Sequence, residues 1–152
     1  MPHEPRRFFA AQAWVGSTWA RDVLLEVDTS GHWAAVQTGV PAAARQGAHV
    51  LGGPVLPGLV NAHSHAFQRA IAGLTEQRGA QGDDFWSWRE RMYAVALRIS
   101  AAQLEAVATR LYNEMLAGGY TQVCEFHYLH NAPADAPAAD PLDMSMALVR
   151  AA

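Results

Sequence analysis

This sequence of 152 residues has a single cysteine, Cys124. One cysteine cannot form a disulfide within the chain, which excludes an internal disulfide framework and is typical of a reducing compartment. The apolar setting of Cys124, between Val123 and Phe126, predicts a buried and inert thiol rather than a nucleophile.

The chain also lacks an excess of positive charge and any long hydrophobic run. Its formal net charge is −3, which gives no electrostatic surface for nucleic acid or for an anionic membrane. No stretch reaches the ~18 apolar residues of a membrane-spanning helix, and no apolar run of signal-peptide length follows the basic residues near the N-terminus. We therefore expect no nucleic-acid partner, no membrane partner and a cytoplasmic location.

The residues that are present are typical of a soluble globular protein. Hydrophobic residues make up 51% of the chain and charged residues 16%, which is enough apolar material for one sizeable core. Three short runs rich in valine, leucine and aromatic residues are separated by turn signals: Phe8–Val15, Asp22–Val27 and Trp33–Gln37. They predict a small antiparallel sheet whose last two strands form a hairpin. Residues 40–53 lack clear periodicity and predict a connection.

A helix is predicted after Asp83 and Asp84, which can cap its first turn. Its apolar residues recur at steps of three and four, namely Phe85, Trp88, Met92, Val95, Ala96 and Ile99. Arg89 lies at the edge of this stripe, and a guanidinium is almost never buried without a partner. The residues alone favour an Arg89 that extends outward to water, with pairing to an anion as the alternative.

The next elements predict a helix followed by a strand. Ser100 and Gln103 form a capping box at the start of a helix that Gly118-Gly119 ends. Tyr120–Phe126 then has the composition of a strand. With the strand near residue 60, this order of elements implies a parallel pair with a right-handed crossover. A further helical pattern begins at Leu142.

The residues around His63 and His65 carry the clearest chemical signal in the chain. Pro57-Gly58 marks a turn, and Leu59 and Val60 fit a short buried strand. Since a strand sends residues i and i+2 to one face, His63 and His65 point the same way. Two converging imidazoles suit a transition metal, zinc above all. The alternative is two polar residues bonded to backbone carbonyls, because two ligands alone do not complete a metal site.

Polar residues also follow the predicted strand that ends at Phe126. His127, Tyr128 and His130 lie at its carboxyl end, where parallel barrels place their chemistry. Alternation along the strand puts Glu125 and His127 on the opposite face from Tyr128. We therefore favour a metal site that does not include Glu125, His127 or His130.

Three separate motifs carry a family resemblance. They are His63-Ser-His65-Ala-Phe-Gln68-Arg69-Ala70, Asp84-Phe-Trp-Ser-Trp-Arg89-Glu-Arg-Met-Tyr93 and Glu125-Phe-His-Tyr128-Leu-His130. The turn and strand before the first motif are similar to the first barrel strand of the amidohydrolase superfamily, and the three motifs together resemble the formimidoylglutamate deiminases within it. The resemblance implies an α/β fold in which residues 55–152 are the first units of a (β/α)8 barrel. Residues 1–54 would then be part of a small β-sandwich.

Length limits that expectation. A (β/α)8 barrel needs about 250 residues, and only about two β/α units fit between residue 55 and the end of this chain. The helical pattern at the C-terminus also lacks a glycine or proline stop signal. We therefore expect a truncated barrel, the N-terminal part of a longer chain.

The resemblance also implies a site and a reaction. His63 and His65 would hold one divalent metal, zinc or another such as iron. Gln68, Arg89 and Tyr128 would bind a small-molecule substrate, with Arg89 on a carboxylate. The implied reaction is hydrolytic deamination of N-formimidoyl-L-glutamate to N-formyl-L-glutamate and ammonia, in histidine degradation. The other metal ligands and the acid and base groups would come from later strands. We therefore expect no catalytic residue within this chain, no activity from it alone, and a homodimer at full length.

Two alternatives remain open from the sequence. A sister amidohydrolase that deaminates a heterocycle such as guanine or cytosine would use the same pair of histidines. Arg89 argues against it, because a neutral heterocycle has no carboxylate for a guanidinium to pair with. The second alternative is a non-catalytic, truncated relic whose motifs survive from an enzyme.

Overall fold

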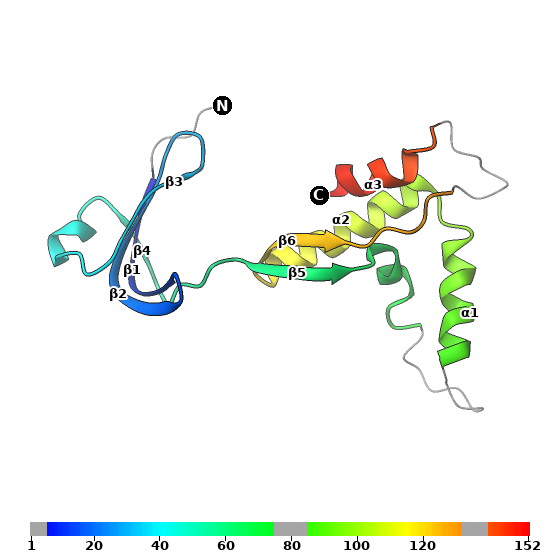
Figure 1. The fold of residues 1–152 in the computed structure, drawn as a ribbon, viewed down its shortest axis with the longest axis horizontal. Coiled ribbons are helices and arrows are strands. Elements are labelled where there is room, and N and C mark those ends of the chain that lie inside the picture. Colours follow the sequence, from blue (N-terminus) through cyan, green and yellow to red (C-terminus); the bar gives the residue numbers. More distant parts are fainter. Residues whose placement is uncertain (1–5, 75–84, 132–139) are drawn as a thin grey trace. The chain divides into compact units, whose positions relative to one another are not determined.

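The computed structural model of the chain describes residues 6–74, 85–131 and 140–152. The chain divides into two compact units, Met1–Pro57 and Gly58–Ala152 (Figure 1). Among the helices of the described segments, none has the length and apolar character needed to cross a membrane.

The first unit is a four-stranded sheet in the order β3-β2-β1-β4. Its strands are β1 (Arg6–Val15), β2 (Thr18–Val27), β3 (Trp33–Gln37) and β4 (His49–Leu51), and a short 3-10 helix, η1 (Ala42–Arg45), precedes β4. The buried side chains of the sheet include Phe9, Ala10, Ala13, Val23 and Leu25. The predicted hairpin is confirmed, because β2 and β3 pair in antiparallel register.

Two details of this sheet differ from the sequence prediction. Strand β2 begins at Thr18 rather than at Asp22, because Gly16 has a φ of 63° and lets the chain turn back within two residues. The predicted connection contains β4, which pairs parallel to β1, so the sheet is mixed rather than antiparallel. A three-residue strand is too short to show a period of two in the sequence.

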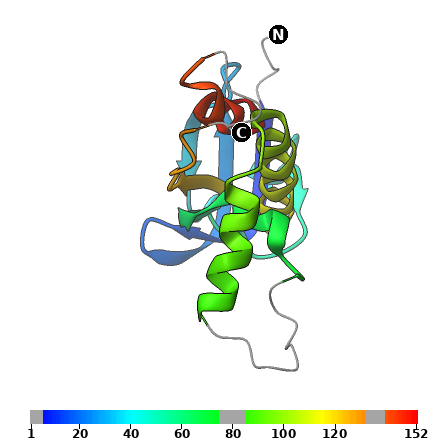
Figure 2. The same ribbon diagram turned by 90° about the vertical axis from the view of Figure 1, so that its right-hand side faces the viewer.

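The second unit contains a parallel strand pair and its helices. The elements are β5 (Leu59–Ser64), η2 (Ala66–Ile71), α1 (Phe85–Ala96), α2 (Ala101–Ala117), β6 (Tyr120–Glu125) and α3 (Asp143–Ala151). Strands β5 and β6 pair in parallel, with Leu59 opposite Tyr120 and Ser64 opposite Glu125, as the order of elements predicts. Helix α3 packs along α2, which is visible in both views (Figures 1 and 2).

Helix α2 begins and ends as its sequence predicts. The Ser100 side chain accepts from the backbone N–H of Gln103 at 3.3 Å, and the Gln103 side chain accepts from the backbone N–H of Ser100 at 3.0 Å. Gly118 caps the other end, and Gly119 follows with a φ of 88°. The core of the unit gathers around α2 and buries Phe67, Ile71, Met92, Ile99, Leu104, Ala108, Tyr112, Met144 and Leu148.

Several predictions of burial are wrong. Leu59 and Val60 are 47% and 53% exposed, and Cys124 is exposed rather than buried. Within the described residues β5 pairs only with β6, and the strand side chain that packs against the helices is Val123. Cys124 alternates with Val123 and therefore points away from that core.

The predicted apolar stripe of α1 is correct only in part. Met92 and Ile99 are buried, whereas Phe85 at the start of the helix is 62% exposed. The first two residues of the helix, Phe85 and Trp86, therefore lie beyond the packed core, which Trp88 is the first to contact. The predicted cap at Asp83 and Asp84 lies outside the described residues.

Candidate functional site

His63 and His65 converge at the end of β5. Their Nε2 atoms lie 2.9 Å apart, and their rings are nearly perpendicular with centroids 4.6 Å apart. His63 belongs to the strand, and His65 is the residue from which η2 starts. The prediction that these two side chains point the same way is confirmed.

The hydrogen bonds of His65 define which of its nitrogens is free to bind a ligand. Its Nδ1 lies 3.0 Å from the backbone oxygen of Phe126. Because a carbonyl oxygen only accepts, Nδ1 carries the proton and Nε2 keeps its lone pair. Nε2 of His63 must then be the donor across the 2.9 Å contact, and a neutral His63 would have to move its proton to Nδ1 to become a second ligand.

This pair fits a divalent metal. Zinc binds imidazole nitrogen at about 2.0–2.1 Å, so two Nε2 atoms 2.9 Å apart can both reach one ion. A ligating histidine commonly donates its other N–H to a backbone carbonyl, as His65 does to Phe126. Within residues 6–74, 85–131 and 140–152, no group of three or more His, Cys, Asp or Glu side chains could hold an ion.

Gln68 and Tyr128 lie beside the histidine pair. The Gln68 amide donates to the Tyr128 hydroxyl at 3.2 Å, and both groups contact the sulfur of Met92, at 3.7 and 3.8 Å. The Tyr128 ring packs edge-on against His65 with centroids 5.1 Å apart and against Phe67 at 5.3 Å. The structure therefore brings together four of the five predicted site residues, from β5, from η2 and from the segment after β6.

The fifth residue, Arg89, lies on the exposed side of α1. Its guanidinium carbon is 5.6 Å from the centre of the Trp86 ring and 5.1 Å from that of Tyr93, and Nη2 donates to the Tyr93 hydroxyl at 3.4 Å. Arg89 is exposed, which agrees with the outward orientation that the residues favour. Its printed contacts are thus with Trp86 and Tyr93 of its own helix, and the structure does not bring it together with the other four predicted site residues.

The residues that we excluded as metal ligands have other surroundings. Glu125 accepts from the backbone N–H of Ala66 at 2.6 Å and from the Tyr112 hydroxyl at 3.4 Å. His127 packs edge-on against His130 with ring centroids 5.1 Å apart. Burial lowers the pKa of His127, with His130 adding to the effect, and its Nε2 is buried without a hydrogen-bond partner.

An ion-pair network that the sequence analysis missed joins η2 to α2. Arg69 makes a two-pronged pair with Glu114, with Nε to Oε2 at 2.8 Å and Nη2 to Oε1 at 2.9 Å. Arg110 adds a third bond to Glu114 at 3.0 Å. These bonds, first from Arg69 and then from Arg110, lower the pKa of Glu114 from 4.5 to about 2. Because Arg69 follows Gln68, the pair anchors the segment that carries a site residue.

The Glu114 network predicts a stability difference that depends on pH. A carboxyl group whose pKa is depressed by folding stabilises the native state above its unfolded pKa, here 4.5, and loses that effect as the pH falls toward about 2. The variant Glu114→Gln should therefore melt below the wild type by a constant margin above pH 4.5, and the margin should shrink at lower pH. Thermal melting curves of both proteins across this range at fixed salt test it. A margin that is independent of pH would contradict this role of Glu114.

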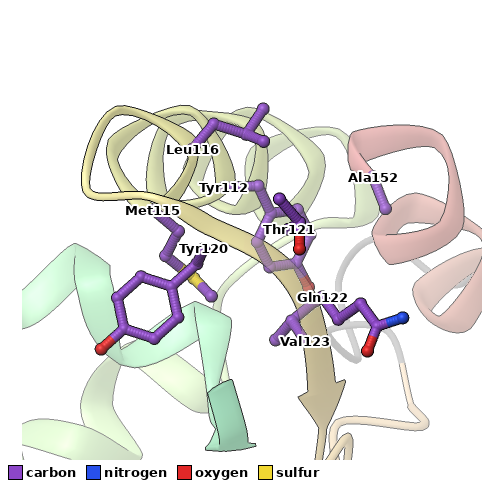
Figure 3. A pocket seen from close by; sticks show the side chains of 8 residues that line it. All are labelled: Tyr112, Met115, Leu116, Tyr120, Thr121, Gln122, Val123 and Ala152. Carbon is purple, nitrogen blue, oxygen red and sulfur yellow. The ribbon is translucent and has the colours of Figure 1, made fainter. Parts of the chain in front are cut away.

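A cavity lies away from these residues. Its volume is about 120 Å³, and it is lined by Tyr112, Met115 and Leu116 of α2, by the first residues of β6 and by Ala152 (Figure 3). The histidines lie at the carboxyl end of β5, and Ser64 there is opposite Glu125, at the far end of β6 from Tyr120. The cavity is therefore not part of the candidate site.

Comparisons with known proteins extend these observations. The sequence profile of the amidohydrolase family matches residues 55–150. The chain is 48% identical over 144 residues to formimidoylglutamate deiminase of Pseudomonas aeruginosa, a match that covers 95% of this chain and 31% of that protein. The structure of an amidohydrolase from Brucella melitensis matches with a TM-score of 0.84 and 41% identity, over 96% of this chain and 32% of that one. The structure of an adenosine deaminase from Xanthomonas campestris with bound zinc matches with a TM-score of 0.57 and 26% identity, over 80% of this chain and 28% of that one. The chain thus spans about a third of the length of these relatives.

Proposed function

The chain belongs to the amidohydrolase family, and from that membership we propose that it is the N-terminal part of a (β/α)8-barrel enzyme that deaminates N-formimidoyl-L-glutamate by hydrolysis. The parallel β5 and β6 pair with its helices supplies the first units of such a barrel. The first unit of the chain, the β3-β2-β1-β4 sheet, supplies part of a small β-sandwich. The identity of 48% to a formimidoylglutamate deiminase, over 31% of that protein, supports both the reaction and the partial length.

The observation that carries the proposal is the convergence of His63 and His65 beside Gln68 and Tyr128. The two imidazoles would hold one divalent metal. Zinc is favoured over iron because the similar adenosine deaminase structure from Xanthomonas campestris carries zinc. When bound, such a metal supplies the Lewis acidity that makes water a nucleophile near neutral pH. The carbonyl of Phe126 keeps His65 in the tautomer that leaves Nε2 free.

The other site residues would bind the two ends of the substrate. The Gln68 amide and the Tyr128 hydroxyl can each donate and accept, and their contact at 3.2 Å places them together beside the histidines. Arg89 would bind a carboxylate of the glutamate portion through charge-assisted bonds. The hydrolysis replaces the imine nitrogen of the formimidoyl group by the oxygen of water and releases ammonia, leaving N-formyl-L-glutamate.

The rest of the machinery would come from outside residues 1–152. A catalytic zinc normally has three protein ligands, and the described residues offer two that converge. We propose that further ligands and the groups that move protons lie on later strands, and that the 152 residues alone are inactive. The full-length enzyme would act on this small molecule in the cytoplasm as a homodimer.

Substrate preference in the full-length protein tests this function. Release of ammonia from N-formimidoyl-L-glutamate should greatly exceed release from guanine or cytosine when each is offered to the zinc-loaded protein. The structural reason is the exposed guanidinium of Arg89, which finds an anionic partner only in the glutamate derivative. Faster release from a heterocycle would overturn the substrate and retain the family, whereas no release from any of them would favour a relic without activity.

A further inference from the structure

The end of β6 holds the segment that carries the two histidines. Oε1 of Glu125 accepts from the backbone N–H of Ala66 at 2.6 Å. Ala66 directly follows His65 and is fully buried. A carboxylate bond to a backbone N–H is a charge-assisted hydrogen bond, which is shorter and stronger than a neutral one. Glu125 therefore restrains the peptide next to His65.

The same carboxylate is itself held in place. Its Oε2 accepts from the Tyr112 hydroxyl at 3.4 Å, and Tyr112 is a buried residue of α2. Burial, together with the charge of Glu125, raises the pKa of Tyr112 to about 12, so the hydroxyl keeps its proton and remains a donor. Each carboxylate oxygen thus has a partner, one on the histidine segment and one on the core helix.

Neighbouring bonds join the same two segments. The backbone N–H of Phe126 donates to the oxygen of Ser64 at 2.8 Å, and Nδ1 of His65 donates to the oxygen of Phe126 at 3.0 Å. The regular register of β5 and β6 shifts between Asn61 and Ser64, so the strand ladder alone does not define this region. Two consecutive residues, Glu125 and Phe126, therefore hold three consecutive residues, 64–66.

From these contacts we infer that Glu125 is a positioning residue for the metal-binding side chain of His65. The inference rests on the proposed metal site and adds a residue that contacts neither metal nor substrate. Without the bond to Ala66, the peptide after His65 could rotate, and the bond between His65 Nδ1 and Phe126 would no longer hold the ring in one orientation. Residues that orient a ligating histidine typically change metal affinity by about 10–100-fold when they are removed.

Two substitutions of Glu125 separate positioning from charge. Glu125→Asp keeps the negative charge but shortens the side chain by one methylene, so the carboxylate cannot bridge Ala66 and Tyr112. Glu125→Gln removes the charge but keeps the length, so its amide oxygen can still accept from Ala66 and its amide N–H can donate to Tyr112. Glu105→Gln is the matched control, because Glu105 pairs with Arg150 at 2.8 Å between α2 and α3 and has no contact with the histidine segment.

The measurement is the affinity of the metal-free, full-length protein for Zn²⁺, by competition with a chromophoric chelator and with melting temperatures recorded for every variant. Positioning predicts that Glu125→Asp weakens zinc binding by about 10–100-fold, that Glu125→Gln weakens it by about fivefold or less, and that Glu105→Gln leaves it unchanged. If Glu125→Asp kept wild-type zinc affinity and Glu125→Gln weakened it, the negative charge rather than the position of the side chain would matter, and the inference would be overturned. Wild-type affinity in the Asp variant would overturn it as well.

Two further variants remove the remaining ambiguities. If Glu125→Asp does not fold, the variant Tyr112→Phe tests the positioning role instead. It leaves Glu125 in place and removes only the hydrogen bond to its Oε2. A loss in zinc affinity of about fivefold is expected, because the bond from Tyr112 to the carboxylate is long, at 3.4 Å, and acts only indirectly on His65. No loss would overturn the positioning role. His63→Ala separates the two proposals: if it leaves zinc affinity unchanged, the metal site itself is wrong. If it abolishes binding while Glu125→Asp binds normally, only the positioning role is wrong.

Discussion

His63→Ala in the full-length protein is expected to abolish metal binding and the hydrolysis that depends on it. The substitution removes one of two imidazole nitrogens that lie 2.9 Å apart. A catalytic zinc normally has three protein ligands, so the loss of one leaves too few to hold the ion. Loss of a residue that only orients a ligand costs about 10–100-fold in metal affinity, so loss of a ligand should cost at least about a hundredfold. Elemental analysis after dialysis, with the rate of ammonia release, measures both effects.

The matched control for this prediction is His49→Ala. His49 is an exposed residue of β4 in the first unit, and its ring packs edge-on against Phe8 with centroids 6.0 Å apart. The control should keep full metal content and full activity. Full metal stoichiometry in His63→Ala would instead mean that the bond between the two histidines is only structural, and that the metal lies elsewhere.

Arg89→Ala is expected to impair the enzyme only toward substrates with a carboxylate. The guanidinium lies between the rings of Trp86 and Tyr93, which hold it on the exposed side of α1. A hydrogen bond to a charged group is worth about 1.5–3 kcal/mol, so kcat/KM for N-formimidoyl-L-glutamate should fall by roughly ten- to a hundredfold. A simple formimidoyl amine without carboxylates should be hydrolysed almost as fast by the variant as by the wild type.

The control for Arg89 is Arg98→Ala, which removes another exposed arginine in the turn that follows the same helix. Its kcat/KM should be unchanged for both substrates. Equal losses for the two substrates in Arg89→Ala would make Arg89 a structural residue of α1 that packs Trp86 and Tyr93. The assignment of a glutamate derivative would then rest on sequence similarity alone.

Features of the site that depend on local geometry could be predicted from the sequence. A side-chain period of two along a strand places His63 and His65 on one side, and their Nε2 contact confirms it. The capping box of Ser100 and Gln103 follows from the needs of the first helical turn and is present. The parallel pairing of β5 with β6 follows from the order of elements and is also confirmed.

Contacts between distant residues could not be predicted. Glu125 and Ala66 are 59 residues apart in the sequence, and Arg69 and Glu114 are 45 apart. No periodicity links such pairs, since each depends on how η2, α2 and β6 pack. Cys124 shows the same limit for burial: its neighbours are apolar, but its exposure depends on which elements cover that face of β6.

The alternation of side chains along β6 makes the length of this strand as important as its composition. Glu125 points toward the histidine segment and α2, whereas Tyr128 points toward the Gln68 amide. Inserting or deleting one residue within β6 (Tyr120–Glu125) would turn the side chain of Glu125 to the opposite face, because every later side chain of the strand would move to the other side. The strand should therefore accept substitutions at exposed positions such as Cys124 but not the insertion or deletion of a single residue.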